Sequence, residues 1–271
     1  MHAFDYQRPA TLRAALDAKR ADPQSQWLAG GMSLLPAMKL RLAAPSRLID
    51  LVDVADLRGI RVDARAVTLG GMTTHREVEH SAEIAVVLPA LGALASGIGD
   101  PQVRSRGTLG GSVANNDPAA DYPAALLALD ARIATPDREL AADAFFKGLF
   151  ETVLTEHEPI VAVRFPVPRR AAYLKFPTPG SRYALVGVFV ADTSEGVRVA
   201  VTGAAAGVFR ARQIEAALDG SFEPAALDDV EVDYGALNDD MHGSAAYRGH
   251  LIKVIAGRAV AAALAGGGRS S

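Results

Sequence analysis

The chain has 271 residues, more than one hydrophobic core usually supports, so two or three domains are expected. Hydrophobic residues make up 49% and charged residues 22%, with a formal net charge of −3; this predicts a folded protein and excludes the basic surface that a nucleic-acid partner requires. The absence of cysteine excludes disulfides, thiolate-bound zinc, a cysteine nucleophile and any iron–sulfur cluster held by this chain.

The start of the chain, residues 1–13, has no apolar stretch of the signal-peptide kind. No window approaches the roughly 20 apolar residues of a membrane span. We therefore expect no membrane span and a cytoplasmic location.

Residues 1–55 are expected to form a small βαβ-like N-terminal domain. Thr11 precedes a helical stretch, and strands are predicted at 27–29 and 48–51. Between them lies the first of two glycine pairs, in Ala29-Gly30-Gly31-Met32-Ser33-Leu34. Glycine lets an anion approach the backbone, and Ser33 is a candidate N-cap of the following helix. The free amides of this turn predict a diphosphate ligand, whereas a tight turn that binds nothing is the alternative.

Residues 56–168 form the expected middle domain. A strand at 67–70 runs into Gly70-Gly71-Met72-Thr73, and Thr74 with Glu77 fits a capping box. An apolar helix is predicted at 86–95, and the second glycine pair follows in Thr108-Leu109-Gly110-Gly111-Ser112.

Acidic residues after the second glycine pair have ordinary structural explanations. Asp117 precedes a proline and fits a turn, and Asp121 is placed to cap a helix at 122–131. Asp121 is also suited to accept hydrogen bonds from ribityl or ribose hydroxyls. His75, Glu79 and His80 predict a solvated helix face rather than a metal site, because a helix places His75 and Glu79 together and turns His80 away.

Residues 169–271 form the expected C-terminal domain, after a connection rich in proline and arginine. Strands are predicted at 184–191 and 197–202, and helices at 213–218 and 245–264, the last capped by Ser244. By default Lys175 is a surface lysine and Tyr183 a strand aromatic packed in the core. The chain lacks the Rossmann glycine fingerprint, the Walker lysine motif and the hydrolase nucleophile elbow.

The two glycine turns occur together with two further motifs, Asp100-Pro101-Gln102-Val103-Arg104 and Asp117-Pro118-Ala119-Ala120-Asp121-Tyr122-Pro123. In this order and spacing, they resemble the FAD-binding medium subunit of the molybdenum hydroxylases. Carbon monoxide dehydrogenase medium subunits are the most similar type, and the xanthine dehydrogenase flavin domain is a relative. The resemblance covers nearly the whole chain.

The resemblance implies an α+β fold of the vanillyl-alcohol-oxidase (PCMH-like) type, with FAD extended between two subdomains. It also implies a C-terminal α+β domain with a three-stranded antiparallel sheet. The first glycine turn matches the loop that holds the diphosphate, Asp121 matches the family's acidic residue, and Tyr183 falls where a tyrosine covers the flavin. The positions implied to contact FAD are Ala29, Gly30, Gly31, Met32, Ser33, Leu34, Ile98, Thr108, Leu109, Gly110, Gly111, Ser112, Asp121, Ile160, Lys175 and Tyr183.

Three features depart from the family pattern. Met32 stands where a histidine, glutamine or other polar residue is frequent, and Ser112 where asparagine is frequent. The stretch between Asp130 and Asp143 is short, which predicts a trimmed hairpin. Because backbone donors do most of the holding, FAD binding is expected to survive.

The function implied is an oxidoreductase subunit for electron transfer. Its partners would be a large molybdopterin subunit and a small [2Fe-2S] subunit, in a dimer of heterotrimers, with FAD passing electrons to an external acceptor. The absence of cysteine agrees with this division of labour. Two alternatives stay open: a stand-alone FAD-dependent oxidoreductase acting on a small molecule, and a scaffold protein without cofactor. The resemblance selects neither the substrate, be it carbon monoxide, an aldehyde, a purine or another N-heterocycle, nor the acceptor.

Overall fold

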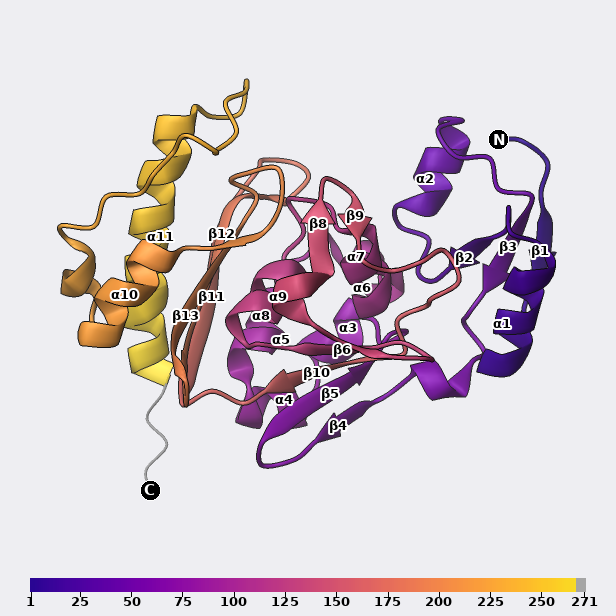
Figure 1. Ribbon diagram of the computed structural model, residues 1–271, viewed down its shortest axis with the longest axis horizontal. Coiled ribbons are helices and arrows are strands. Elements are labelled where there is room, and N and C mark those ends of the chain that lie inside the picture. Colours follow the sequence, from indigo (N-terminus) through magenta and orange to yellow (C-terminus); the bar gives the residue numbers. More distant parts are fainter. Residues whose placement is uncertain (267–271) are drawn as a thin grey trace.

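The computed structural model describes residues 1–266 and contains three main sheets arranged along the long axis of the molecule (Figure 1). The last five residues of the expected C-terminal domain, 267–271, lie outside the described residues. The N-terminal unit has a parallel sheet in the order β1-β3-β2, as a βαβ-like pattern requires. Its elements are β1 (Asp5–Gln7), α1 (Leu12–Ala21), β2 (Gln26–Leu28), α2 (Leu34–Lys39) and β3 (Arg47–Asp50).

The middle sheet is antiparallel, in the order β4-β5-β10-β6-β7, and helices pack beside it. Its strands are β4 (Ile60–Val62), β5 (Ala66–Gly70), β6 (Arg132–Ala134), β7 (Glu139–Ala141) and β10 (Ala162–Pro166). A short hairpin of β8 (Phe146–Gly148) and β9 (Glu151–Thr152) lies apart from it. The remaining elements are η1 (Ala55–Leu57), α3 (His75–Glu79), α4 (Ala82–Val87), α5 (Pro89–Ser96), α6 (Pro101–Arg106), α7 (Leu109–Asn115), α8 (Tyr122–Ala128) and α9 (Ala142–Phe145).

Local signals in the middle region are partly confirmed. The capping box forms, since Glu77 N donates to Thr74 Oγ1 at 3.2 Å and Thr74 N to the Glu77 carboxylate at 2.6 Å. The helix expected over 86–95 is wrong, because α4 ends at Val87 and α5 begins at Pro89. Pro89 has no N–H and disfavours helical backbone at Leu88, where φ is −144° and ψ 64°.

The C-terminal sheet has four antiparallel strands, so the expectation of three is wrong by one short strand. They are β11 (Arg170–Pro177), β12 (Ala184–Thr193), β13 (Gly196–Thr202) and the two-residue β14 (Phe209–Arg210). β14 adds only two register pairs to β13, Ala200 with Arg210 and Val201 with Phe209. A strand of two residues carries too little alternation to be recognised in a sequence.

Both faces of the C-terminal sheet are buried. Phe189 and Ala191 of β12 belong to the core shared with α5 and α8 of the middle region, while Val188 and Val190 face the other way. That other face is covered by α10 (Arg212–Gly220), η2 (Pro224–Leu227) and α11 (Ala245–Gly266). Because successive side chains of β12 point to opposite faces and both faces are buried, β12 is a nearly continuous apolar run.

Helix α11, at the opposite end of the molecule from the N-terminal unit, is long and apolar enough to cross a membrane by length and composition (Figure 1). From the sequence, no membrane-spanning segment is expected. In the structure its buried side chains, among them Ile252, Ile255 and Val260, pack against β11 and β12. This packing explains its apolar composition as that of a core helix.

Candidate functional site

A cavity of about 1220 Å³ is lined by residues from all three parts of the chain. Trp27 and Leu34 come from the N-terminal unit, Gly71 and Thr108 from the middle region, and Tyr183 from the turn before β12. Small-ligand pockets usually enclose about 300–1,000 Å³, so this cavity suits a larger ligand such as a dinucleotide. Of the sixteen predicted positions, all except Leu109 and Lys175 line it.

The first glycine loop presents a run of free backbone donors. Gly31 has φ +74°, a backbone conformation that glycine adopts without strain, and the Leu35 N–H donates to Gly31 O at 3.1 Å. Among the residues that the structure describes, none accepts a hydrogen bond from the N–H groups of residues 30–34. Consecutive amides of this kind form an anion-binding concavity, which fits a diphosphate. Ser33 contributes no side-chain cap, so that part of the prediction is wrong.

The second glycine pair differs, because its amides are already engaged. The N–H groups of Leu109, Gly110 and Gly111 donate to Thr73 O, Gly71 O and Thr108 Oγ1, at 2.9, 2.8 and 3.1 Å. Thr108 thereby caps α7. These three amides are therefore not free to hold an anion.

Glycine is required in both turns by backbone packing within the protein. A Cβ on Gly30 would lie 2.1 Å from Arg106 O, and a Cβ on Gly110 would lie 2.7 Å from Gly71 O. Real Cβ atoms do not approach other atoms so closely. Both loops thus pack on backbone of residues 71–107 with no side chain between, and both line the same cavity.

Asp121 lies at the cavity wall with an exposed fraction of 4%, and its side chain does not cap α8. The capping prediction is wrong because the carboxylate crosses to β11. Its Oδ1 accepts hydrogen bonds from Tyr173 Oη at 2.5 Å and from Lys175 Nζ at 2.8 Å. Burial raises the pKa of Asp121, and the Lys175 ammonium and the Tyr173 hydroxyl act in the opposite direction.

The default interpretations of Lys175 and Tyr183 are both reversed. Lys175 has a side chain only 10% exposed and lies behind Asp121 rather than at the cavity wall. Tyr183 is 45% exposed at the cavity, in the turn between β11 and β12. Its aromatic ring is therefore available to a ligand rather than packed in the core.

The other predicted positions take different places around the cavity. Ile160 is 5% exposed and Ile98 is half-buried, and both side chains form apolar parts of the cavity wall. Met32 is 40% exposed. Leu109 is fully buried in the core behind α7, because a helix that begins at the wall must turn its first apolar side chain inward.

Several wall residues were missed by the sequence analysis. Gly71 and Met72 line the cavity, and so does His75. The segment Gly70-Gly71-Met72 repeats the Gly-Gly-Met sequence of residues 30–32. Phe150, at the tip of the β8–β9 hairpin, also reaches it, with φ +54°. This repeated Gly-Gly-Met sequence was the one feature of the sequence that could have indicated these wall residues. The position of Phe150 depends on tertiary contacts instead.

His75 is a buried neutral imidazole. Its exposed fraction is 4%, its ring lies 5.4 Å from that of Tyr122, and Nδ1 has no hydrogen-bond partner among the described residues. Burial, with a contribution from the nearby Arg104, lowers the pKa of His75 to about 4. Glu79 pairs with Arg104 at 2.8 Å, and no group of metal-ligating side chains occurs within residues 1–266.

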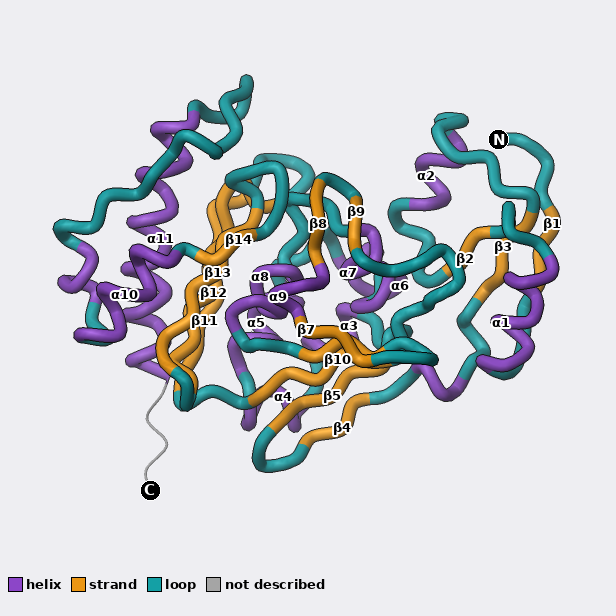
Figure 2. The backbone as a smooth tube through the Cα atoms, viewed as in Figure 1, coloured by secondary structure: helices purple, strands orange, loops and turns teal. Residues whose placement is uncertain are grey.

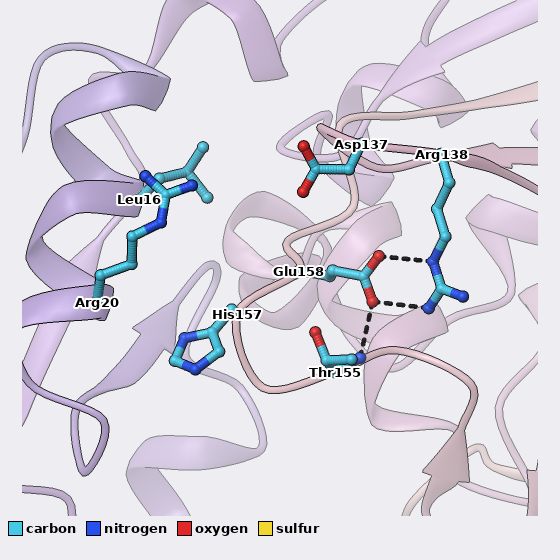
Figure 3. Close-up of a pocket in the computed structure, with 7 residues that line it drawn as sticks. All are labelled: Leu16, Arg20, Asp137, Arg138, Thr155, His157 and Glu158. Atoms are coloured by element: carbon cyan, nitrogen blue, oxygen red, sulfur yellow. Dashed lines mark hydrogen bonds and ion pairs between the residues drawn. The ribbon is translucent and has the colours of Figure 1, made fainter.

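A smaller crevice of about 330 Å³ lies between α1 and the loop before β10 (Figure 3). Leu16 and Arg20 of α1 face Asp137, Arg138 and the loop 155–158 across it. Arg138 holds Glu158 at 2.7 Å and lowers the pKa of that carboxyl to about 2. Glu158 also lines the large cavity, so this ion pair braces one of its walls.

Comparisons with known proteins agree along the whole chain. Residues 2–168 match the family model described as the FAD binding domain in molybdopterin dehydrogenase. Residues 171–263 match the CO dehydrogenase flavoprotein C-terminal domain. The family match identifies FAD as the cofactor. The free amides of residues 30–34, the cavity volume and the buried carboxylate of Asp121 fit this cofactor.

Individual relatives are similar over three quarters or more of their length. The nicotine 6-hydroxylase medium subunit of Paenarthrobacter nicotinovorans is 36% identical, over 95% of this chain and 96% of its own. The carbon monoxide dehydrogenase medium chain of Hydrogenophaga pseudoflava is 36% identical, over 74% and 75%.

Solved structures show the same likeness. A chain of Cu,Mo-CO dehydrogenase superposes with a TM-score of 0.87 at 32% identity, over 97% of this chain and 98% of that one. A chain of quinoline 2-oxidoreductase from Pseudomonas putida 86 gives 0.85 at 28% identity, over 98% of each chain. The protein belongs to the family of FAD-binding medium subunits of the molybdenum hydroxylases.

Proposed function

We propose that this chain is the electron-transfer flavoprotein of a molybdenum hydroxylase complex. In this proposal it receives electrons from the [2Fe-2S] clusters of a small subunit and passes them to an external acceptor. A large molybdopterin subunit hydroxylates the substrate, and the assembly is a dimer of heterotrimers. The observation that carries the proposal is a dinucleotide-sized cavity, with free amides at one wall, in a chain without a single cysteine.

The residues of this chain have the task of binding and orienting the cofactor. FAD, when bound, supplies the redox chemistry itself. In this proposal the amides of residues 30–34, which are free in the described structure, hold the diphosphate, and the exposed ring of Tyr183 covers the flavin. Because no cysteine is available, the clusters that supply electrons must be carried by another polypeptide.

A reduction experiment separates this function from that of a stand-alone oxidoreductase. The purified chain is loaded with FAD and mixed anaerobically with aldehydes, purines and other N-heterocycles, first alone and then with co-expressed partner subunits. We expect the flavin absorbance to bleach only in the presence of the partners. Bleaching of the isolated chain by one of these compounds would instead show that it oxidises a substrate directly.

A further inference from the structure

Two side chains of β11 hold Asp121 from the C-terminal sheet. Tyr173 and Lys175 are two residues apart on one strand, so both project from the same face of the sheet. Both bonds end on the same carboxylate atom, Oδ1 of Asp121. All three side chains are nearly or fully buried, with exposed fractions of 7% for Tyr173, 10% for Lys175 and 4% for Asp121.

The second oxygen of the same carboxylate is left for a ligand. No other residue within the described part of the chain donates a hydrogen bond to Oδ2 of Asp121, while Asp121 lines the cavity. An ionised carboxylate accepts about four hydrogen bonds. One oxygen therefore anchors the side chain, and the other keeps its acceptor capacity.

The two donors oppose the protonation of Asp121 that burial favours. Burial and the neighbouring Asp121 carboxylate both raise the pKa of Tyr173, which keeps its hydroxyl protonated and able to donate. Burial raises the pKa of Asp121, whereas the charge of Lys175 and the hydrogen bonds from Lys175 and Tyr173 lower it. Removal of either donor therefore favours protonation of the carboxyl.

The main chain before Asp121 is fastened to the same sheet. Thr202 Oγ1 lies 2.9 and 2.7 Å from the carbonyl oxygens of Pro118 and Ala120, and its one hydroxyl hydrogen is shared between them. The Gly203 N–H donates to Pro118 O at 2.7 Å, and the Ala184 N–H to Ala119 O at 3.3 Å. Both the backbone and the carboxylate of Asp121 thus take their position from the C-terminal sheet.

We propose that Tyr173 is a positioning residue that, with Lys175, holds Asp121 so that Oδ2 accepts a hydrogen bond from a ribityl hydroxyl of FAD. The ribityl chain is favoured over the ribose because it adjoins the flavin ring, which Tyr183 is proposed to cover. Tyr183 lies in the turn between β11 and β12, and Asp121 is held by β11 of the same sheet. The free amides expected to hold the diphosphate come instead from the N-terminal unit. The proposal rests on FAD as cofactor and is independent of the source of the electrons.

The test compares the binding of FAD and ADP to the full chain. ADP engages the diphosphate loop but has no ribityl chain, so it serves as an internal control. We expect Tyr173→Phe to raise the Kd for FAD about 5- to 20-fold, because Asp121 loses one of the two donors that orient it, and to leave the Kd for ADP unchanged. In an Asp121→Ala background, which lacks the acceptor, Tyr173→Phe should have no further effect on the Kd for FAD. Tyr234→Phe, at a tyrosine 55% exposed and outside the cavity, is the matched control.

A second readout needs no cofactor. The carboxyl carbon of Asp121 is followed by 13C NMR in the apo chain, with Asp121→Asn for assignment. Tyr173→Phe should raise the pKa of Asp121, whereas the control Tyr234→Phe should change neither this pKa nor the thermal midpoint of the chain. Equal weakening of FAD and ADP, or an unaltered pKa, would overturn the proposal. If the wild-type chain bound no FAD, that result would count against the proposed function, and the NMR titration would decide the role of Tyr173.

Discussion

His75 lies in the wall of the FAD cavity, yet its burial makes it a liability at acidic pH. Its Nδ1 has no partner in the described structure, and burial lowers the pKa of His75 to about 4 from its ordinary value of 6.5. Between these two values the unfolded chain binds a proton that the folded chain does not bind. The free energy of unfolding therefore falls as the pH falls through this window.

We predict that His75 alone costs up to about 3 kcal/mol of stability between pH 7 and pH 4. Urea unfolding of the wild type and of His75→Gln at intervals across this range measures it. The substituted chain should lose less stability than the wild type on acidification. His80→Gln, at an imidazole 64% exposed, should retain the wild-type pH dependence. Parallel curves for the wild type and His75→Gln would contradict the assignment.

At the scale of single elements, helix α7 is placed by the contact of its first turn with the backbone of Gly71. The N–H of Gly110 donates to Gly71 O at 2.8 Å, and no Cβ fits between them. Alanine is the better helix former by about 0.5–1 kcal/mol, so helix propensity alone would favour a substitution at Gly110. The steric contact opposes it.

We predict that Gly110→Ala destabilises the chain and lowers its FAD content. The new Cβ would lie 2.7 Å from Gly71 O and 2.9 Å from Gly71 Cα, and overpacking of this kind costs about 1–3 kcal/mol. Flavin absorbance per chain and urea unfolding measure the two effects. Gly207→Ala is the control, since nothing lies within 4 Å of its Cβ, and should change stability by less than about 0.5 kcal/mol. Normal stability and flavin content in Gly110→Ala would refute the packing argument.

At the scale of the whole molecule, the FAD cavity joins parts of the chain that are far apart in sequence. The loop between β9 and β10 runs toward the N-terminal unit, where Trp27 Nε1 donates to Glu156 O at 3.0 Å (Figure 2). At the other side the cavity is bounded by Tyr183, beside the C-terminal sheet. The shape of the cavity thus depends on how the three sheets are packed together.

Trp27, the single tryptophan of the chain, provides a reporter of cofactor loading. It lines the cavity, and flavin absorbs light where indole emits, so we predict that FAD quenches most of the Trp27 emission. A fluorescence titration should reach its end point at equimolar FAD. ADP, which lacks the absorbing ring, should quench far less. Undiminished emission from chains shown by ultrafiltration to hold FAD would contradict the position of Trp27.

Part of the fold could be predicted from local patterns. The alternation of apolar residues and the capping residues Thr11, Thr74 and Ser244 identified several helices and strands, because caps and periodicity depend on a few neighbouring residues. The break at Leu88 and the two-residue β14 were missed, since one depends on a single proline and the other on an edge pairing. The order of the glycine motifs was specific enough to indicate the family.

The sequence by itself determined the composition of the site: glycines that allow close backbone approach, an acidic residue, and no cysteine to hold a cluster. Only the tertiary structure decided which donors remain free, engaging the amides at Gly110 and Gly111 and leaving those of residues 30–34. It also turned Asp121 from a helix cap into a carboxylate held by Tyr173, 52 residues away. Burial and hydrogen-bond partners depend on which distant segments the folded chain brings together, and no local pattern encodes them.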